Sequence, residues 1–256
     1  MISFGPAGLG PVKTAIGQLE QYHKLGFRAC EIAFTYSAYI KSQTDAQAIG
    51  AKARELGISL SIHGSYFINL NAKEQEKAES TKQRILEACK VGHWLGAKTL
   101  VIHPGYYSDD KEQTYLNVKN RIAEILKEIK KNNWSIKLAP ETMGKVNVFG
   151  SVEEVSRLVR DTGCSFCIDF AHILARDKSV DYSKVKALFP QKEWHVHFSG
   201  IIYGDKGEKS HKTTTKEEWN SLLKELPKDK SITIINESPT MIQDSQEGLK
   251  IYKKIS

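Results

Sequence analysis

The stretch VIHPGYY (101–107) joins an apolar run, of the kind that forms a buried strand, to a histidine, a proline and a glycine. A second stretch, SLSIHGSYFIN (59–69), also runs from apolar residues into a histidine and a glycine. Similar runs occur along the whole chain. The full set is ISFG (2–5), CEIAF (30–34), LSIHG (60–64), LVIHPG (100–105), IKLAPET (136–142), FCIDFAH (166–172), WHVHFSG (194–200) and ITIINESP (232–239).

The segments between these runs have the spacing of amphipathic helices, for example 73–96 and 114–133. Several of them end on a glycine before the next strand, in KLGF, ELGIS, WLGAK and DTGCS, which suits a left-handed helix cap. Strands at a mean repeat of about 32 residues, each followed by a helix, predict an α/β fold, a single-domain (β/α)8 TIM barrel. We expect this domain to cover residues 1–256. An open doubly wound sheet is the alternative, but no GxGxxG follows the first strand.

Composition limits the class of protein. The chain has 256 residues, enough for a sizeable core, and 4 scattered cysteines, too few for a disulfide framework. The N-terminus lacks the pattern of a secretory signal, and no run approaches the ~20 apolar residues of a membrane span. We therefore expect a soluble, cytoplasmic protein without a membrane partner, and a monomer. The net charge of +7 is compatible with a polyanionic partner but is weak support by itself.

Acidic residues and histidines close six adjacent strands. In a (β/α)8 barrel the carboxyl ends of the strands carry the active site. The residues at these ends are His63, His103, Glu141, Asp169, His172, His197 and Glu237. One such histidine is more often structural, but carboxylates gathered at one rim carry a large desolvation cost, which metal ions offset. Histidine with carboxylate and no thiolate suits zinc, manganese or iron, and the number of ligands implies two or three ions.

The segment after the seventh strand, YGDKGEKSHKTT (203–214), adds two further candidates. Composition alone favours a polar surface loop. Its place at the same rim makes His211 a predicted ligand and leaves Glu208 open between ligand and loop residue.

Six motifs along nearly the whole chain resemble those of the endonuclease IV family, the metal-dependent apurinic/apyrimidinic (AP) endonucleases built on a xylose-isomerase-like barrel. They are HGSYFINL (63–70), HPG (103–105), PETMGK (140–145), CIDFAH (167–172), HFSG (197–200) and NESP (236–239). The resemblance implies a zinc-dependent hydrolase of base excision repair. It would cleave double-stranded DNA at the phosphodiester 5′ to an abasic site.

The same resemblance implies three metal ions, zinc or in some sites Mn²⁺ or Fe²⁺. The first would be held by His63, His103 and Glu141, the second by Glu141, Asp169, His197 and Glu237, and the third by His172 and His211. The bridging Glu141 and the ligand Glu237, which also orients the attacking hydroxide, would be catalytic. The family has an aspartate two residues before the last histidine, where this chain has Lys209. Glu208 is the possible substitute.

For DNA, the resemblance makes Tyr66 and Phe67 a wedge that fills the gap left by a flipped abasic sugar. The phosphate-contact candidates are Lys145, Lys206, Lys209 and Lys212. The family places a basic probe after the second strand, whereas TYSAYIKS (35–42) offers Tyr36, Tyr39 and Lys41.

Two other classes remain open. A sugar isomerase or epimerase on the same barrel would need one divalent ion held by Glu141, Asp169, His197 and Glu237. A nucleic-acid-binding module without activity would explain the charge but not the carboxylates. We expect His195, one pleat before His197, to be structural.

Overall fold

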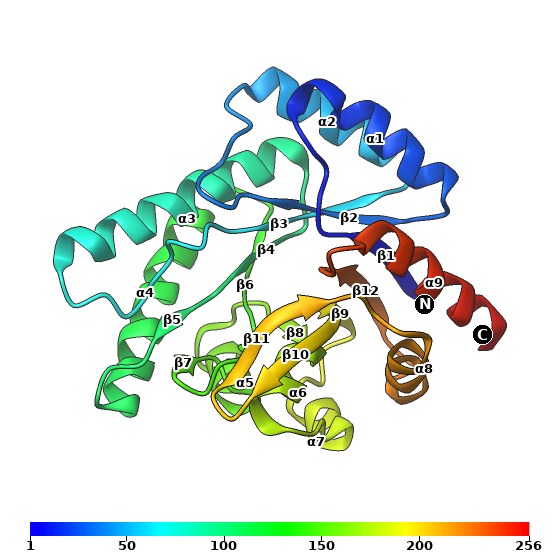
Figure 1. Cartoon of the computed structure of the whole chain (residues 1–256). Coiled ribbons are helices and arrows are strands. Elements are labelled where there is room, and N and C mark those ends of the chain that lie inside the picture. The colour runs from blue at the N-terminus through cyan, green and yellow to red at the C-terminus, as the bar shows by residue number, and fades with distance from the viewer. Residues whose placement is uncertain (256) are drawn as a thin grey trace.

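The structure, a computed structural model, describes residues 1–255 as a closed barrel of parallel strands with helices outside it (Figure 1). The predicted (β/α)8 fold is confirmed. The barrel strands are β1 (Ile2–Pro6), β2 (Ala29–Ala33), β3 (Ser59–His63), β4 (Thr99–Ile102), β6 (Lys137–Pro140), β8 (Cys167–Asp169), β9 (Glu193–Phe198) and β12 (Ser231–Asn236). The helices are α1 (Val12–Lys24), α2 (Gln43–Glu55), α3 (Gln75–Leu95), α4 (Lys111–Lys131), α5 (Val152–Thr162), α6 (Phe170–Asp177), α7 (Tyr182–Leu188), α8 (Lys216–Glu225) and α9 (Met241–Ile255).

The barrel consists of two four-stranded sheets, in the orders β1-β12-β9-β8 and β2-β3-β4-β6, that meet at two seams. At the first seam the Arg28 amide donates to the Phe4 carbonyl at 3.1 Å. The backbones come so close there that a Cβ on Gly5 would lie 1.8 Å from the Ala29 carbonyl oxygen. At the second seam Glu141 forms an isolated parallel bridge with Cys167. Glycine at position 5 is therefore a requirement of closure.

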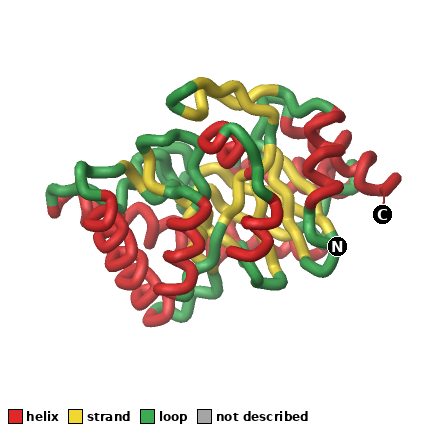
Figure 2. Tube along the Cα trace, turned by 90° about the horizontal axis from the view of Figure 1, so that it is seen from below, coloured by secondary structure: helices red, strands yellow, loops and turns green. Residues whose placement is uncertain are grey.

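Helices surround the strands, and apolar side chains fill the layer between them (Figure 2). Ile62, Leu100 and Leu138 from three neighbouring strands are fully buried in this layer. The four glycines expected to end helices, Gly26, Gly57, Gly96 and Gly163, all have positive φ, which confirms that prediction. Among residues 1–255, no helix has the length and apolar character needed to span a membrane.

Two stretches differ from the sequence prediction. The run 166–172 was expected to be one strand, but β8 ends at Asp169 and α6 begins at Phe170. The cause is the Asp169 side chain, whose Oδ1 accepts the His172 amide at 2.7 Å and so caps the helix. The expected surface loop 203–214 is largely a hairpin of β10 (Gly200–Gly204) and β11 (Gly207–Lys212).

The hairpin stands out from one end of the barrel, as the paired strands at the top of Figure 2 show. A second short antiparallel pair, β5 (Gly105–Tyr106) with β7 (Val148–Phe149), lies in the loops that follow β4 and β6. Both additions extend the strand ends that carry the candidate ligands.

Candidate metal centre

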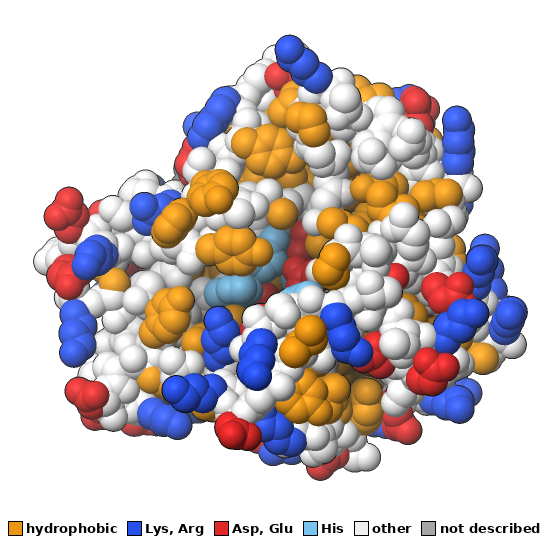
Figure 3. All heavy atoms as spheres, in the orientation of Figure 1, with side chains coloured by type: hydrophobic (Ala, Val, Ile, Leu, Met, Phe, Trp, Pro, Cys, Tyr) orange, Lys and Arg blue, Asp and Glu red, His pale blue; other side chains and the backbone are white. Residues whose placement is uncertain are grey.

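Histidine and carboxylate side chains from six strands meet in a hollow at the carboxyl ends of the barrel strands (Figure 3). Within residues 1–255, several groups have ligand atoms within 4.8 Å of one another. Those at the mouth are His63 with His103 and Glu141; His63 with His197 and Glu237; Glu141 with Asp169, His197 and Glu237; and His172 with Glu208 and His211. The structure thus brings together every ligand that the sequence suggested.

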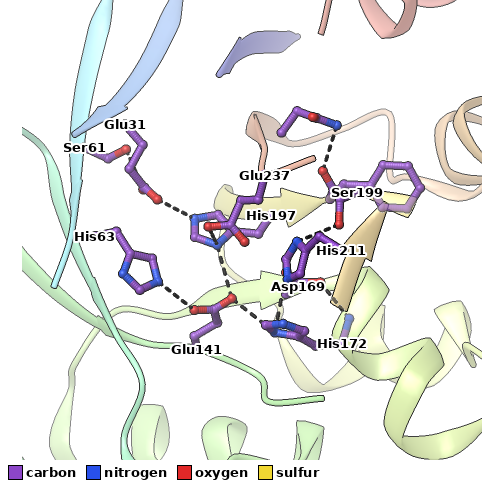
Figure 4. Close-up of polar contacts among 12 residues, drawn as sticks. Glu31, Ser61, His63, Glu141, Asp169, His172, His197, Ser199, His211 and Glu237 are labelled. Atoms are coloured by element: carbon purple, nitrogen blue, oxygen red, sulfur yellow. Dashed lines mark hydrogen bonds and ion pairs between the residues drawn. The ribbon is translucent and has the colours of Figure 1, made fainter. Parts of the chain in front are cut away.

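Glu141 lies at the centre of this arrangement and is fully buried. Its Oε2 lies 3.4 Å from Nε2 of His63 and 3.1 Å from Nε2 of His103. Its Oε1 lies 3.2 Å from Nδ1 of His197 and 3.3 Å from Nδ1 of His172 (Figure 4). One carboxylate therefore faces two groups of potential ligands at once, as a bridging ligand does.

The group of His172 and His211 contains Glu208, which the sequence left open between ligand and loop residue. Nε2 of His172 lies 3.4 Å from its Oε2, and Nε2 of His211 lies 3.8 Å from its Oε1. Residues three apart on a regular strand face opposite sides. Here the register shifts, because Ile202 pairs with Ser210 and Tyr203 pairs with Glu208, so that the intervening residue has no partner on β10. This β-bulge puts Glu208 on the same face as His211.

The tip of the hairpin reaches the centre because two glycines let it approach. The Glu208 amide donates to the Gly144 carbonyl at 3.0 Å. A Cβ on Gly144 would lie 2.8 Å from Cβ of Glu208, and one on Gly207 would lie 2.1 Å from the Gly144 carbonyl oxygen. Gly207 also has a φ of +92°, which favours glycine. The two glycines therefore allow the contact that places Glu208 beside His172.

The second ring nitrogen of most of these histidines has a partner outside the hollow. Nδ1 of His63 lies 2.9 Å from the Gly64 carbonyl, and Nδ1 of His172 lies 3.0 Å from the Thr142 carbonyl. Nδ1 of His211 lies 2.9 Å from Oγ of Ser199. Such contacts fix the ring and leave Nε2 free toward the centre, the usual arrangement of metal-binding histidines.

Two buried carboxylate oxygens, Oε2 of Glu141 and Oδ2 of Asp169, have no hydrogen-bond partner among residues 1–255. The charges here perturb one another. Burial opposes ionisation of Glu237, but the charge and hydrogen bond of His197 outweigh it and lower the pKa to about 2. Burial would lower the pKa of His63, but the close contact with the Glu141 carboxylate and its charge raise it to about 9. The unpartnered carboxylate oxygens, and the negative charge that raises the pKa of His63, indicate a site suited to divalent cations.

Beneath the centre lies a carboxylate that the sequence analysis missed. Glu31 on β2 is fully buried, and its Oε2 accepts a hydrogen bond from Ser61 at 2.8 Å and contacts Nε2 of His195 at 3.0 Å. A glutamate inside the apolar run CEIAF was the available signal. Cys167 lies near His195 and His197, but burial raises the pKa of its thiol well above the usual range.

Hydrophobic and cationic side chains lie around the hollow (Figure 3). Tyr66 and Phe67 are 63% and 57% exposed. Of the four candidate phosphate contacts, Lys212 forms an ion pair with Glu218 at 3.0 Å. The other three are exposed and have no ion pair within residues 1–255; they are Lys145, Lys206 and Lys209.

Comparison with known sequences gives both a family and relatives. A profile described as the xylose isomerase-like TIM barrel matches residues 19–255. The chain is 35% identical to uncharacterized protein MJ0133 of Methanocaldococcus jannaschii, over 100% of this chain and 98% of that protein. It is 30% identical to an apurinic-apyrimidinic endonuclease of Caenorhabditis elegans, over 44% of this chain and 30% of that protein. The chain therefore matches less than a third of the nematode enzyme.

Solved structures of the same fold include proteins of different activity. SacUVDE has a TM-score of 0.78 and 17% identity, with 99% of this chain and 98% of that chain covered. Endonuclease IV from Thermus thermophilus has a TM-score of 0.71 and 20% identity, with 98% of each covered. D-psicose 3-epimerase from Clostridium cellulolyticum has a TM-score of 0.71 and 14% identity, with 99% of each covered. These similarities establish the fold.

Proposed function

Because the chain belongs to the xylose isomerase-like TIM barrel family, we propose that it is a metal-dependent AP endonuclease, which cleaves DNA 5′ to abasic sites. The observation that carries this proposal is the number of ligand groups at the barrel mouth. An isomerase with one ion would use Glu141, Asp169, His197 and Glu237 alone. The groups around His63 with His103, and around His172 with His211, then have no role. Three ions use all of them.

When bound, the metal ions supply a hydroxide at neutral pH and neutralise the charge of the phosphodiester. The chain's own residues set the geometry. Glu141 belongs both to the group with His63 and His103 and to the group with Asp169, so it would hold two ions. In the group of Glu141, Asp169, His197 and Glu237, the side chain of Glu237 is the one that reaches solvent, with 17% of it exposed. Its Oε1 lies 3.4 Å from Nδ1 of His197. It is therefore placed to orient the attacking water on the substrate side.

The third ion would be held by His172, His211 and Glu208. The β-bulge at Lys209 would let the Glu208 side chain take the place of the aspartate that the endonuclease IV family has two residues before the histidine. Lys209 itself is exposed and leaves the ligand face free.

The exposed aromatic residues supply a surface for a distorted duplex. Tyr66 and Phe67 would fill the gap in the base stack, a role that suits exposed rings next to the hollow. Tyr36, in the segment where the family has a basic probe, is 73% exposed, and its ring centroid lies 6.1 Å from that of Phe67. Lys145 and Lys206 would contact phosphates as exposed surface charges.

A sugar epimerase is the second candidate, favoured by the complete four-residue group around Glu141 and Glu237. Two carboxylates on one ion can move a proton on and off carbon beside a carbonyl. This reaction needs one ion per chain, and the nuclease reaction needs two or three.

A duplex oligonucleotide with one abasic site tests the proposal. The protein should cut it on the 5′ side, leaving a 3′-hydroxyl and a 5′-deoxyribose phosphate, because hydroxide attacks phosphorus. Glu141→Gln should lose bound metal and cleavage together. Glu193→Gln makes the same chemical change at an exposed position at the start of β9, where Glu193 pairs with Lys137, and should change neither.

Elemental analysis of the same preparations completes the experiment. Two or three ions per chain with cleavage of the abasic duplex supports the endonuclease. One ion per chain, no cleavage, and turnover of a ketose or sugar phosphate would establish the epimerase in its place.

A further inference from the structure

Glu31 needs an explanation that the ligand groups do not give. It is a fully buried carboxylate, yet among residues 1–255 it belongs to no group of three or more potential metal ligands. Burying a carboxylate without compensation is costly, so the contacts that hold it are informative. Two imidazoles, those of His195 and His197, each lie 3.0 Å from one of its oxygens.

One oxygen of the Glu31 carboxylate is held by hydrogen bonds, and the other oxygen faces His197. Ser61, its register partner on β3, donates to Oε2 at 2.8 Å, and Nε2 of His195 lies 3.0 Å from the same oxygen. Oε1 lies 3.0 Å from Nε2 of His197 (Figure 4). The contact between Oε1 of Glu31 and Nε2 of His197 is an ion pair and not a hydrogen bond, because an N–H on Nε2 would not point at Oε1.

His197 thus lies between two acidic regions. Its Nε2 faces Glu31, while its Nδ1 faces the metal centre, 3.2 Å from Oε1 of Glu141 and 3.4 Å from Oε1 of Glu237. A neutral imidazole carries its proton on one nitrogen and a lone pair on the other. An ionised carboxylate only accepts hydrogen bonds, so Glu31 favours the proton on Nε2 and leaves the lone pair on Nδ1.

This arrangement differs from that of His63 and His211, which present Nε2 to the centre and have Nδ1 on a neutral oxygen. His197 presents Nδ1, and its outer partner carries a full charge. A charged partner raises the basicity of a ligand nitrogen more than a neutral carbonyl does.

We propose that Glu31, held by Ser61 and His195, is a positioning residue that keeps the His197 ring in the tautomer whose Nδ1 binds the second metal ion. The inference rests on the metal centre of the proposed function and does not depend on the substrate. It also gives His195 a role, because His195 holds the carboxylate that orients His197.

Zinc affinity tests the proposal without any substrate. Competition with a chromogenic chelator should show ~10–100-fold weaker binding at one site in Glu31→Gln, the usual effect of losing such a partner. The amide is uncharged and has one donor end, so it cannot present an acceptor oxygen to both histidines as the carboxylate does. Ser61→Ala should cause a smaller loss in the same direction. Ser156→Ala removes a buried hydrogen bond to the Leu188 carbonyl between α5 and α7, and should lower stability without changing zinc affinity.

A spectroscopic measurement on the wild-type protein avoids dependence on a variant that folds poorly. With ¹⁵N-labelled histidine and zinc bound, His197 should show a protonated Nε2 and a metal-shifted Nδ1. Zinc on Nε2, or unchanged zinc affinity in a folded Glu31→Gln protein, would overturn the assignment. A wild-type protein that binds no zinc would instead refute the metal centre itself, and zinc binding without cleavage of abasic DNA would refute only the nuclease.

Discussion

The free energy of unfolding of the metal-free protein should fall as the pH rises from 6.5 to 9. Burial would lower the pKa of His63, but its contact with Glu141 and the charges of Glu141, Glu237 and Glu31 raise it from 6.5 to about 9. Because the folded-state pKa lies above the unfolded one, the stabilisation is fully present below pH 6.5 and is lost as the pH rises through 9. The difference between 6.5 and about 9 corresponds to about 3 kcal/mol.

Bound metal should reverse this dependence. A proton on His63 occupies the nitrogen that would bind the ion, so zinc affinity should rise about tenfold per pH unit for each proton displaced. Burial would lower the pKa values of His172 and His197, but nearby charges raise both, that of Asp169 for the first and those of Glu237 and Glu31 for the second. They extend the same trend to higher pH.

The assay is urea unfolding of chelator-treated and zinc-loaded protein at pH values between 6.5 and 9. The metal-free protein should lose about 3 kcal/mol across this range, and His63→Gln should remove that part of the dependence. A free energy of unfolding that stays constant or increases with pH in the metal-free protein would refute the electrostatic reasoning.

Three further predictions concern the bulge, the seam and the DNA surface. Glu208→Gln should lower the metal content by one ion per chain. Deletion of Lys209 should not, because it leaves Glu208 two residues before His211 on a regular strand, where both side chains face the same side. Equal metal loss in both variants would contradict the role of the bulge. Gly5→Ala should destabilise the barrel by at least ~1–3 kcal/mol in urea unfolding, since its Cβ would overlap the Ala29 carbonyl; wild-type stability would refute this. Lys206→Ala should reduce the slope of log affinity against log salt for abasic duplex by about 0.9, and an unchanged slope would exclude a phosphate contact.

The sequence predicted the barrel and the strand ends well, for a physical reason. A run such as LVIHPG changes abruptly from apolar to polar where the strand leaves the barrel, so His103 marks the rim directly. Asp169 was found by the same change, although it caps α6 instead of continuing a strand. A helix cap and a strand end look alike in sequence because both place a short polar side chain after an apolar run.

Glu31 and the hairpin were missed for different reasons. Strands of a (β/α)8 barrel are buried on both faces, one against helices and one toward the barrel axis, so alternation does not reveal which face Glu31 occupies. The segment GEKSHK (207–212) lacks the apolar alternation of a strand because β10 and β11 form a separate two-stranded sheet whose residues are mostly exposed or half-buried. Its bulge depends on register, which a single strand does not encode.

The bulge at Lys209 also bears on how this centre tolerates changes in chain length. A one-residue insertion in a strand normally reverses every side chain beyond it, and would be expected to abolish a binding site at once. Here the extra residue is absorbed at a single position, and Glu208 faces the same side as His211 despite the altered spacing. Relatives of this chain are therefore better aligned by strand face than by distance along the sequence. A search for an acidic residue two positions before the histidine would overlook a protein that keeps one at three.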